Sequence, residues 1–180
     1  MDFLDFDGHA LYFDEPLTRE HEALLKRASE VYPDREAEAL LDKLYDERRE
    51  SLTVLVALYR YYYYQHRYED ALNIAEQALS ISAMNMGLKV GWEHLNEQHL
   101  GQGVFMSMGL IRFYMLALKG SAYLLLRLGR IDEALSRLKK LVELDPNDQF
   151  GADVLYRMAQ KEQVNRHANE HKNIESLFRR

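Results

Sequence analysis

The chain has 180 residues, of which 47% are hydrophobic, and it contains no cysteine. This length suits one domain with a single core, and the lack of cysteine excludes disulfides, thiolate nucleophiles and cysteine-based metal sites. A formal net charge of −6 disfavours nucleic acid as a ligand, because phosphate binding depends on a cationic surface.

An acidic, aromatic arm is predicted at 1–16. Residues 1–17 carry five carboxylates and no Lys or Arg, and apolar side chains alternate with the acidic ones: Phe3, Leu4, Phe6, Leu11, Tyr12 and Phe13. This composition is too apolar for a purely solvated tail. Two interpretations stay open. The arm caps the first helix pair, or it docks in a groove of its own chain or of a second copy in a homodimer.

The N-terminus lacks a basic region followed by an apolar core and a cleavage site, so we expect a cytoplasmic protein. A helical domain is then predicted at 17–162. Pro16 and Thr18 precede a helix that extends to about residue 32, and Pro33 starts a second helix that extends to about residue 49. Together they are interpreted as a degenerate helix pair at 17–50.

The clearest helix pair is predicted at 115–148. Gly129 suits a helix end that needs a left-handed backbone, and Asp132 and Glu133 favour the start of a new helix. Pro146 then ends that helix. Apolar residues recur every three to four positions on both sides of Gly129, so the two helices are predicted to form an antiparallel hairpin.

The order of small and large residues in this hairpin resembles the tetratricopeptide repeat. The residues at the consensus positions are Leu118, Ala122, Leu125, Ala134, Leu138 and Pro146. Ser121 stands where the family prefers leucine. A second copy is predicted at 51–85, with Tyr59 where the repeat has a small residue and Ala83 in place of the proline. The resemblance implies an all-α fold, in which antiparallel helix hairpins stack as a short right-handed superhelix with a concave groove.

The spacing of the two copies does not match whole periods of about 34 residues, so an insert and helix extension is predicted at 86–114. In or beside it lie the only tryptophan and most of the methionines, and these give a second, weaker partner-binding surface: Met84, Met86, Trp92, Met106 and Met108. The alternative is that they fill an irregular core. The apolar run at 104–128 is interrupted by Arg112, Lys119 and Arg127, which indicates a buried helix and no membrane span.

After Pro146, apolar residues lie on one side of 149–162, as in the helix that closes a repeat stack. Residues 163–180 are interpreted as a polar, frayed tail. Two histidine pairs, His167 with His171 and His94 with His99, supply too few ligands for a metal site, and no phosphate loop or nucleophile motif occurs. We therefore expect no enzyme, metal or cofactor.

In such repeats the first helix of each pair lines the concave side. The register assigns eight residues to that face: Val56, Arg60, Tyr63, Tyr64, Lys119, Tyr123, Leu126 and Arg127. Three are cations and none is acidic, so the predicted ligand is an extended acidic segment with aromatics. The family's clamp for acidic chaperone tails is not expected, because Tyr123 stands where that clamp has asparagine.

The function expected from these features is a non-catalytic protein-protein interaction module, an adaptor or assembly scaffold that binds a partner peptide. A particular form is similar to the small acidic tetratricopeptide chaperones of bacterial secretion substrates. The alternative of another class is a metal-dependent enzyme or regulator that uses the histidines of the insert.

Overall fold

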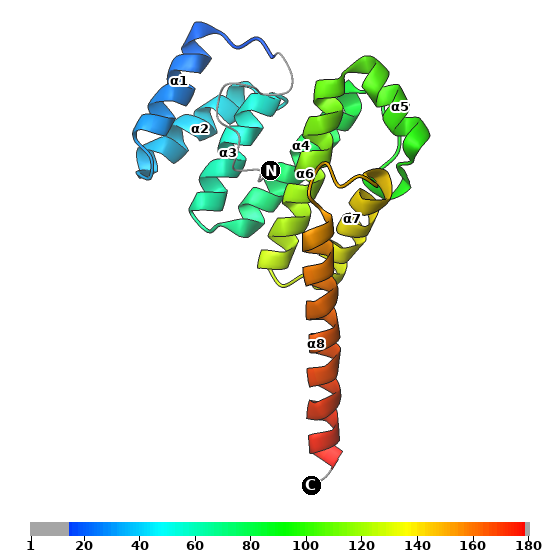
Figure 1. Cartoon of the computed structure of the whole chain (residues 1–180). Helices are drawn as coiled ribbons and strands as arrows, with labels where there is room; N and C mark the ends of the chain where they lie inside the picture. Colours follow the sequence, from blue (N-terminus) through cyan, green and yellow to red (C-terminus); the bar gives the residue numbers. More distant parts are fainter. Residues whose placement is uncertain (1–14, 179–180) are drawn as a thin grey trace.

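The computed structural model describes residues 15–178, and within them the chain is all-helical (Figure 1). The predicted all-α fold is confirmed. Most of the predicted arm, and the last two residues of the predicted tail, lie outside the described residues. The elements are α1 (Arg19–Glu30), α2 (Arg35–Glu47), α3 (Leu52–Tyr64), α4 (Tyr68–Asn85), the 3₁₀-helix η1 (Trp92–His94), α5 (Glu97–Met106), α6 (Met108–Arg127), α7 (Ile131–Leu144) and α8 (Asp153–Phe178).

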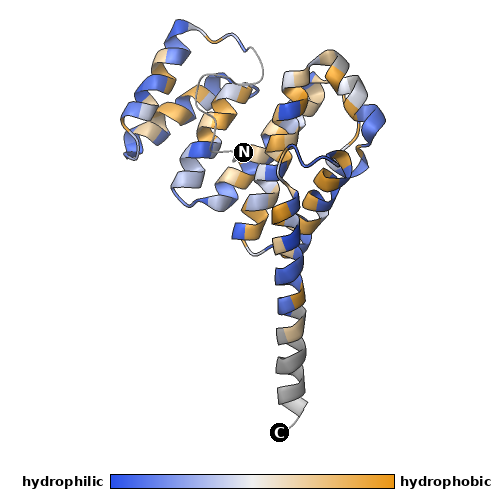
Figure 2. Cartoon of the chain, in the orientation of Figure 1, coloured by the Kyte–Doolittle hydropathy of each residue, from blue (hydrophilic) through white to orange (hydrophobic). Residues whose placement is uncertain are grey.

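Three helix pairs pack as hairpins: α1 with α2, α3 with α4, and α6 with α7. Neighbouring pairs are joined by contacts of α2 with α3 and of α4 with α6. Apolar residues gather where these helices face one another (Figure 2). The element order matches the predicted pairs at 17–50, 51–85 and 115–148, and α6 begins earlier than the last pair, within the predicted helix extension.

Local sequence signals set the helix ends. Thr18 and Ser51 cap α1 and α3, because each hydroxyl accepts a hydrogen bond from the backbone N–H three residues later, at 3.2 Å and 3.3 Å. Gly129 adopts φ +74°, the left-handed conformation predicted for the end of α6. The N–H of Arg130 donates to the carbonyl of Leu125 at 2.8 Å, which closes this turn.

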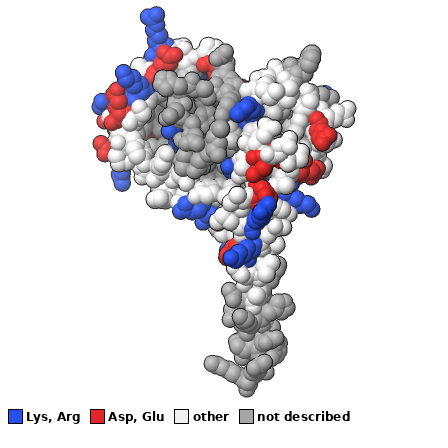
Figure 3. All heavy atoms as spheres, viewed as in Figure 1, with Lys and Arg blue, Asp and Glu red and all other residues white. Residues whose placement is uncertain are grey.

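An exposed ion pair bridges the two helices of the α1–α2 hairpin. Arg27 pairs with Glu36 at 3.1 Å across the hairpin, and basic and acidic side chains lie side by side over these two helices (Figure 3). The exposed pair contributes little to stability, because water screens it. The apolar core of this hairpin is correspondingly small, with Ala28, Ala37, Leu41 and Leu44 as its buried residues.

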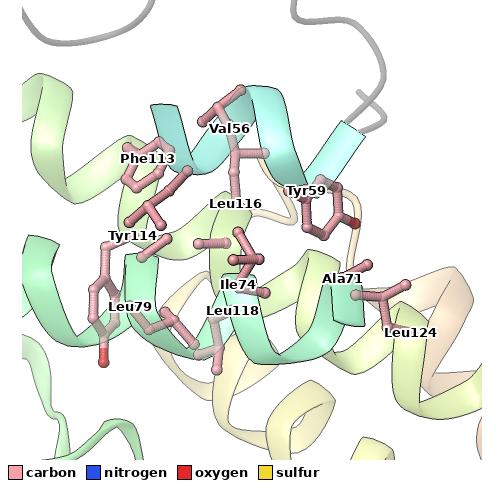
Figure 4. Packing of buried hydrophobic residues seen from close by; sticks show 14 of the residues in the cluster. Val56, Tyr59, Ala71, Ile74, Leu79, Phe113, Tyr114, Leu116, Leu118 and Leu124 are labelled. Atoms are coloured by element: carbon pink, nitrogen blue, oxygen red, sulfur yellow. The ribbon is translucent and has the colours of Figure 1, made fainter. Parts of the chain in front are cut away.

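The main core lies between α3, α4, α6 and α7 (Figure 4). The five apolar residues at the repeat positions of the last hairpin are all completely buried: Leu118, Ala122, Leu125, Ala134 and Leu138. Tyr59, which replaces a small residue in the other hairpin, is also buried. The predicted apolar stripes therefore form the contact between helices.

Helix α6 has the length and composition of a membrane span, with a mean hydropathy of 1.3. However, 67% of this window is buried inside the protein. Its apolar side chains are covered by α4, α5 and α7. The prediction of a buried core helix agrees with this packing.

The prediction of a frayed tail at 163–180 is wrong over most of its length. Helix α8 is continuous from Asp153 to Phe178 and so passes through the boundary predicted at residue 162. Residues 163–178 contain no Gly or Pro, and a helix that is already nucleated extends at little cost through polar residues. A polar sequence therefore does not by itself indicate a frayed tail.

Two cations of α7, Lys140 and Arg137, fasten the insert to the hairpins, and Lys140 donates a hydrogen bond to the carbonyl of Leu95 at 3.3 Å. Arg137 of α7 donates a hydrogen bond to Ser121 Oγ at 2.6 Å, and its Cζ lies 5.3 Å from the centroid of the Trp92 ring. Arg137 Nη1 also lies 2.5 Å from the buried Oε1 of Glu76, an ion pair without the alignment of a hydrogen bond. Ser121, the departure from the repeat consensus, therefore has a polar partner.

We predict that Arg137→Met lowers the free energy of unfolding by about 1–2 kcal/mol, because Glu76 and Ser121 lose their cationic partner. Urea denaturation measures the change. Trp92 is the only tryptophan, so its fluorescence is expected to move to longer wavelength as the ring is exposed. Glu76→Gln in the same background is expected to restore part of the stability. No restoration would contradict the role of the ion pair.

The second prediction concerns Tyr114, which is buried. Burial, with smaller contributions from the carboxylates of Glu93 and Glu76, raises the pKa of its hydroxyl to about 12 from 10.0. The folded state thus keeps the proton at a pH where the unfolded state loses it, and stability falls as the pH rises above 10. Between about pH 9 and pH 11, the native chain should lose about 1.4 kcal/mol more than Tyr114→Phe. If urea denaturation gives the same loss of unfolding free energy for the native chain and for Tyr114→Phe, the hydroxyl is not buried and neutral as described.

Candidate functional site

Three of the predicted face residues meet near the C-terminal ends of α3 and α6. Tyr63 Oη donates a hydrogen bond to Tyr123 Oη at 3.4 Å, and the two ring centroids lie 6.1 Å apart. Arg127, one turn after Tyr123, donates from Nη1 to the same hydroxyl at 3.2 Å. The first helices of the two hairpins thus bring these three side chains into contact.

Tyr68, the first residue of α4, completes the group and was missed in the sequence. The Cζ atom of Arg127 lies 4.6 Å from the centroid of the Tyr68 ring, and Arg127 also donates a hydrogen bond to its hydroxyl. Tyr59 stacks on Tyr63 with a centroid distance of 6.2 Å and an interplanar angle of 11°. We call Tyr59, Tyr63, Tyr68, Tyr123 and Arg127 the tyrosine–arginine cluster.

A weak sequence signal for Tyr68 existed. Tyr68 and Ile131 are equivalent first residues of the second helices, and Ile131 is buried while Tyr68 is only half-buried. A residue with a polar tip at this position indicates a polar partner. One polar partner, His66, is two residues away at 2.9 Å, but Arg127 is 59 positions away in the chain, so spacing alone did not identify it.

Arg127 is the exposed, charged member of the cluster. Its hydrogen bond with Tyr123 raises the pKa of the guanidinium above its already high value, so the group is cationic at every physiological pH. Two tyrosine hydroxyls and a ring face hold the guanidinium in one orientation. A guanidinium has five N–H donors, so donors remain for a carboxylate that approaches from solvent.

Arg60 and Tyr64 line a different part of the surface. With residues of α1 and α2 they form a pocket of about 350 Å³, whose other lining residues are Leu25, Ala28, Ser29, Tyr32, Leu41, Ala57 and Tyr61. We call it the aromatic pocket. Its mouth is marked by two partly exposed rings, those of Tyr32 and Tyr64, whose centroids are 6.3 Å apart. The mainly apolar lining with one cation suits an aromatic side chain next to a carboxylate.

The polar wall of this pocket is fixed from α2. Tyr61 Oη donates to Glu38 Oε2 at 3.4 Å, and Glu38 also pairs with Arg67, which precedes α4. Burial, followed by the charge of Glu38, raises the pKa of Tyr61 above its ordinary value, so this hydroxyl stays a donor. The pocket wall is therefore set by contacts of α2 with α3.

Three further predicted face residues have structural roles. Val56 is buried with 6% exposure, so its assignment to a ligand-facing surface is wrong, because its side chain belongs to the core between α3, α4 and α6. Lys119 donates a hydrogen bond to the carbonyl of Phe150 at 2.8 Å and thereby holds the α7–α8 connection. Leu126 is half-buried against the core.

The residues of the weaker surface predicted in the insert also differ in their exposure, and some of them are covered by other parts of the protein. Met86 is buried with 3% exposure, and its assignment to a binding surface is wrong because it packs under α5, with its sulfur near Gly103. Trp92 is half-buried beneath Arg137. The other methionines, Met84, Met106 and Met108, are exposed.

Within the described part of the chain, no group of three or more His, Cys, Asp or Glu residues has an arrangement that could hold a metal ion. His94 is exposed in η1 and His99 is half-buried at the start of α5. The metal-dependent alternative therefore has no ligand set among the residues that the structure describes.

Comparison with known proteins identifies a relative. The chain is 44% identical over 155 residues to an uncharacterized 19.8 kDa protein in the nifW 5′ region of Azotobacter chroococcum mcd 1, an alignment that covers 86% of each chain. This chain belongs to the same family. No family model and no solved structure matches the sequence.

The tyrosine–arginine cluster makes a quantitative prediction. A double-mutant cycle of Arg127→Ala with Tyr68→Leu, measured by urea denaturation, should give a coupling free energy of about 0.5–1 kcal/mol, because the cation lies over the ring. The matched control cycle pairs Arg127→Ala with Tyr45→Leu, since Tyr45 lies on α2 and bonds Gln77. Coupling near zero in the first cycle, or equal in both, would contradict the described stacking.

Proposed function

We propose that this protein is a non-catalytic, tetratricopeptide-like interaction module, an adaptor or assembly scaffold that binds an extended segment of a partner protein. The observation that carries the proposal is the exposed guanidinium of Arg127, held between the hydroxyls of Tyr123 and Tyr68. A cation oriented before binding loses little side-chain freedom when a carboxylate arrives. Tyrosine and arginine are also the residue types that dominate binding energy at protein interfaces.

The distribution of charge supports an acidic ligand. Helices α3 and α6 contain no Asp or Glu, although the chain as a whole carries −6, and their four charged residues are Arg60, Arg112, Lys119 and Arg127. The partner segment that fits is therefore acidic, with an aromatic side chain for the aromatic pocket. Complementary charge of this kind favours fast association and discriminates against basic segments.

The relation to tetratricopeptide repeats is supported by the hairpin pairs and by the complete burial of Ala122, Ala134 and Leu138 at consensus positions. The burial of most of α6 is compatible with the cytoplasmic location that we propose. The Azotobacter relative lies in the nifW 5′ region, so the product of nifW is the first partner to test, since neighbouring bacterial genes commonly encode proteins that act together.

The test is site-specific photocrosslinking in the living cell. A photoreactive phenylalanine replaces Tyr64 at the mouth of the aromatic pocket, and in the matched control it replaces Lys139, which is exposed on α7. We expect one defined protein adduct at position 64 and none at position 139. Mass spectrometry identifies the partner.

The adduct is expected to disappear when Arg127→Ala is added, and to persist when Arg157→Ala is added on α8. Adducts of equal intensity at positions 64 and 139 would refute binding at this face. An adduct at position 64 whose intensity is unchanged by Arg127→Ala would refute it as well. Circular dichroism of each variant checks that the fold is intact.

A further inference from the structure

The first described residue, Glu15, lies at the start of α3. Glu15 Oε2 accepts hydrogen bonds from the backbone N–H and the hydroxyl of Thr53, both at 3.0 Å. Glu15 Oε1 lies 3.8 Å from Arg48 Nη2. The carboxylate thus sits at the positive end of the α3 dipole and fixes the point from which residues 1–14 continue.

Residues 1–14 are long enough to reach the whole face from this point. An extended chain of this length spans up to about 46 Å, whereas the 13 residues of α3 span about 20 Å and the 20 residues of α6 about 30 Å. On α6, one side of the helix carries Arg112, Lys119, Tyr123 and Arg127 at half-buried or exposed positions, and Leu116 between them is buried in the core. The bond between Tyr63 and Tyr123 shows that this stripe and α3 border the same surface.

The arm and this face are complementary in composition. Residues 1–14 contain four aspartates, Asp2, Asp5, Asp7 and Asp14, and no Lys or Arg. The α3 and α6 helices have the opposite pattern, with four cations and no carboxylate. Between the aspartates the arm has aromatic side chains that match the aromatic pocket in chemistry. Every other described α-helix contains at least one Asp or Glu.

We propose that residues 1–14 dock on the α3–α6 face of their own molecule and occupy the site that a partner's acidic segment takes. The inference rests on the proposed function, because it makes the arm an internal competitor for that site. A partner then binds only by displacing the arm. The tether gives the arm an effective concentration of about 1 mM, so docking within one molecule outcompetes docking of a second copy's arm in dilute solution.

The absence of cysteine makes a direct measurement possible. Gly8→Cys carries a nitroxide spin label on the full chain, and paramagnetic broadening is measured at backbone amides. We expect strong broadening for residues of α3 and for Lys119 and Tyr123, and none at Lys139 on α7. Asp5→Asn with Asp7→Asn should abolish most of the broadening, because the charges that attract the arm are lost.

A mixed sample tests whether the docked arm comes from the same molecule or from a second copy. One chain carries the spin label and no isotope, and the other carries the isotope and no spin label. Broadening in this mixture, where the spin label and the observed amides are on different chains, assigns the arm to a second copy and overturns the proposal. Absence of broadening in both samples, or equal broadening at Lys139, also overturns it.

A second measurement gives the strength of the competition. The probe is a fluorescent peptide with the sequence of residues 1–14, and the receptors are the native chain and a full chain with all four arm aspartates changed to asparagine. If the peptide binds the altered chain with Kd about 100 μM, the native arm at about 1 mM should weaken its binding about tenfold. Equal affinity for both chains contradicts docking.

The two proposals fail in distinguishable ways. If the arm docks but the chain has no partner, the broadening is present and photocrosslinking at position 64 gives no adduct, even with the arm aspartates changed. If a partner binds but the arm does not dock, the adduct forms with the same yield in the native and the altered chain and the broadening is absent.

Discussion

The structure depends on the packing of α6, which must bury apolar side chains on several sides at once. Helix α4 packs on it from the preceding hairpin, α7 from its own hairpin, and α5 near its start. Phe113, Leu118 and Leu125 are completely buried in this arrangement. The stripe of α6 that contains Lys119, Tyr123 and Arg127 is less covered by these neighbours. The candidate face is thus the side of the central helix that packing leaves open.

Two departures from the repeat pattern gain a physical reason in this arrangement. Ser121 replaces an apolar residue, and its hydroxyl accepts a hydrogen bond from Arg137, which in turn covers Trp92. Tyr59 replaces a small residue, and its ring stacks on Tyr63. In the first case the change accommodates the insert, and in the second it builds the tyrosine–arginine cluster. Each departure therefore lies where a helix pair of this chain makes an additional contact, with the insert in one case and within the tyrosine–arginine cluster in the other.

The hairpins could be predicted from sequence because their signals are local. Gly129, Thr18 and Ser51 mark helix ends through contacts a few residues away, and the apolar periodicity gave the buried faces. The candidate face was only partly predictable. Helical register placed Tyr63, Tyr123 and Arg127 on a shared side, but it does not say how deeply a neighbouring helix covers each position.

That limit explains the errors. Val56 and Met86 have suitable chemistry for a binding surface, and both are covered by elements distant in sequence. Tyr68 was missed because its contact with Arg127 crosses from one hairpin to the next. The residues 163–178 were misjudged for another reason, since a polar sequence is compatible with an exposed helix as well as with an unstructured tail.

Helix α8 projects from the helical body as a single rod (Figure 1). Its 26 residues span about 39 Å, and Ala159 is the only one that is completely buried among those whose side chains are described. A body with a rod attached rotates more slowly end over end than around the rod. The relaxation of each backbone amide in solution therefore depends on the angle between its N–H bond and α8. The rod acts as an internal reference axis, against which the inclination of every hairpin can be measured without a crystal.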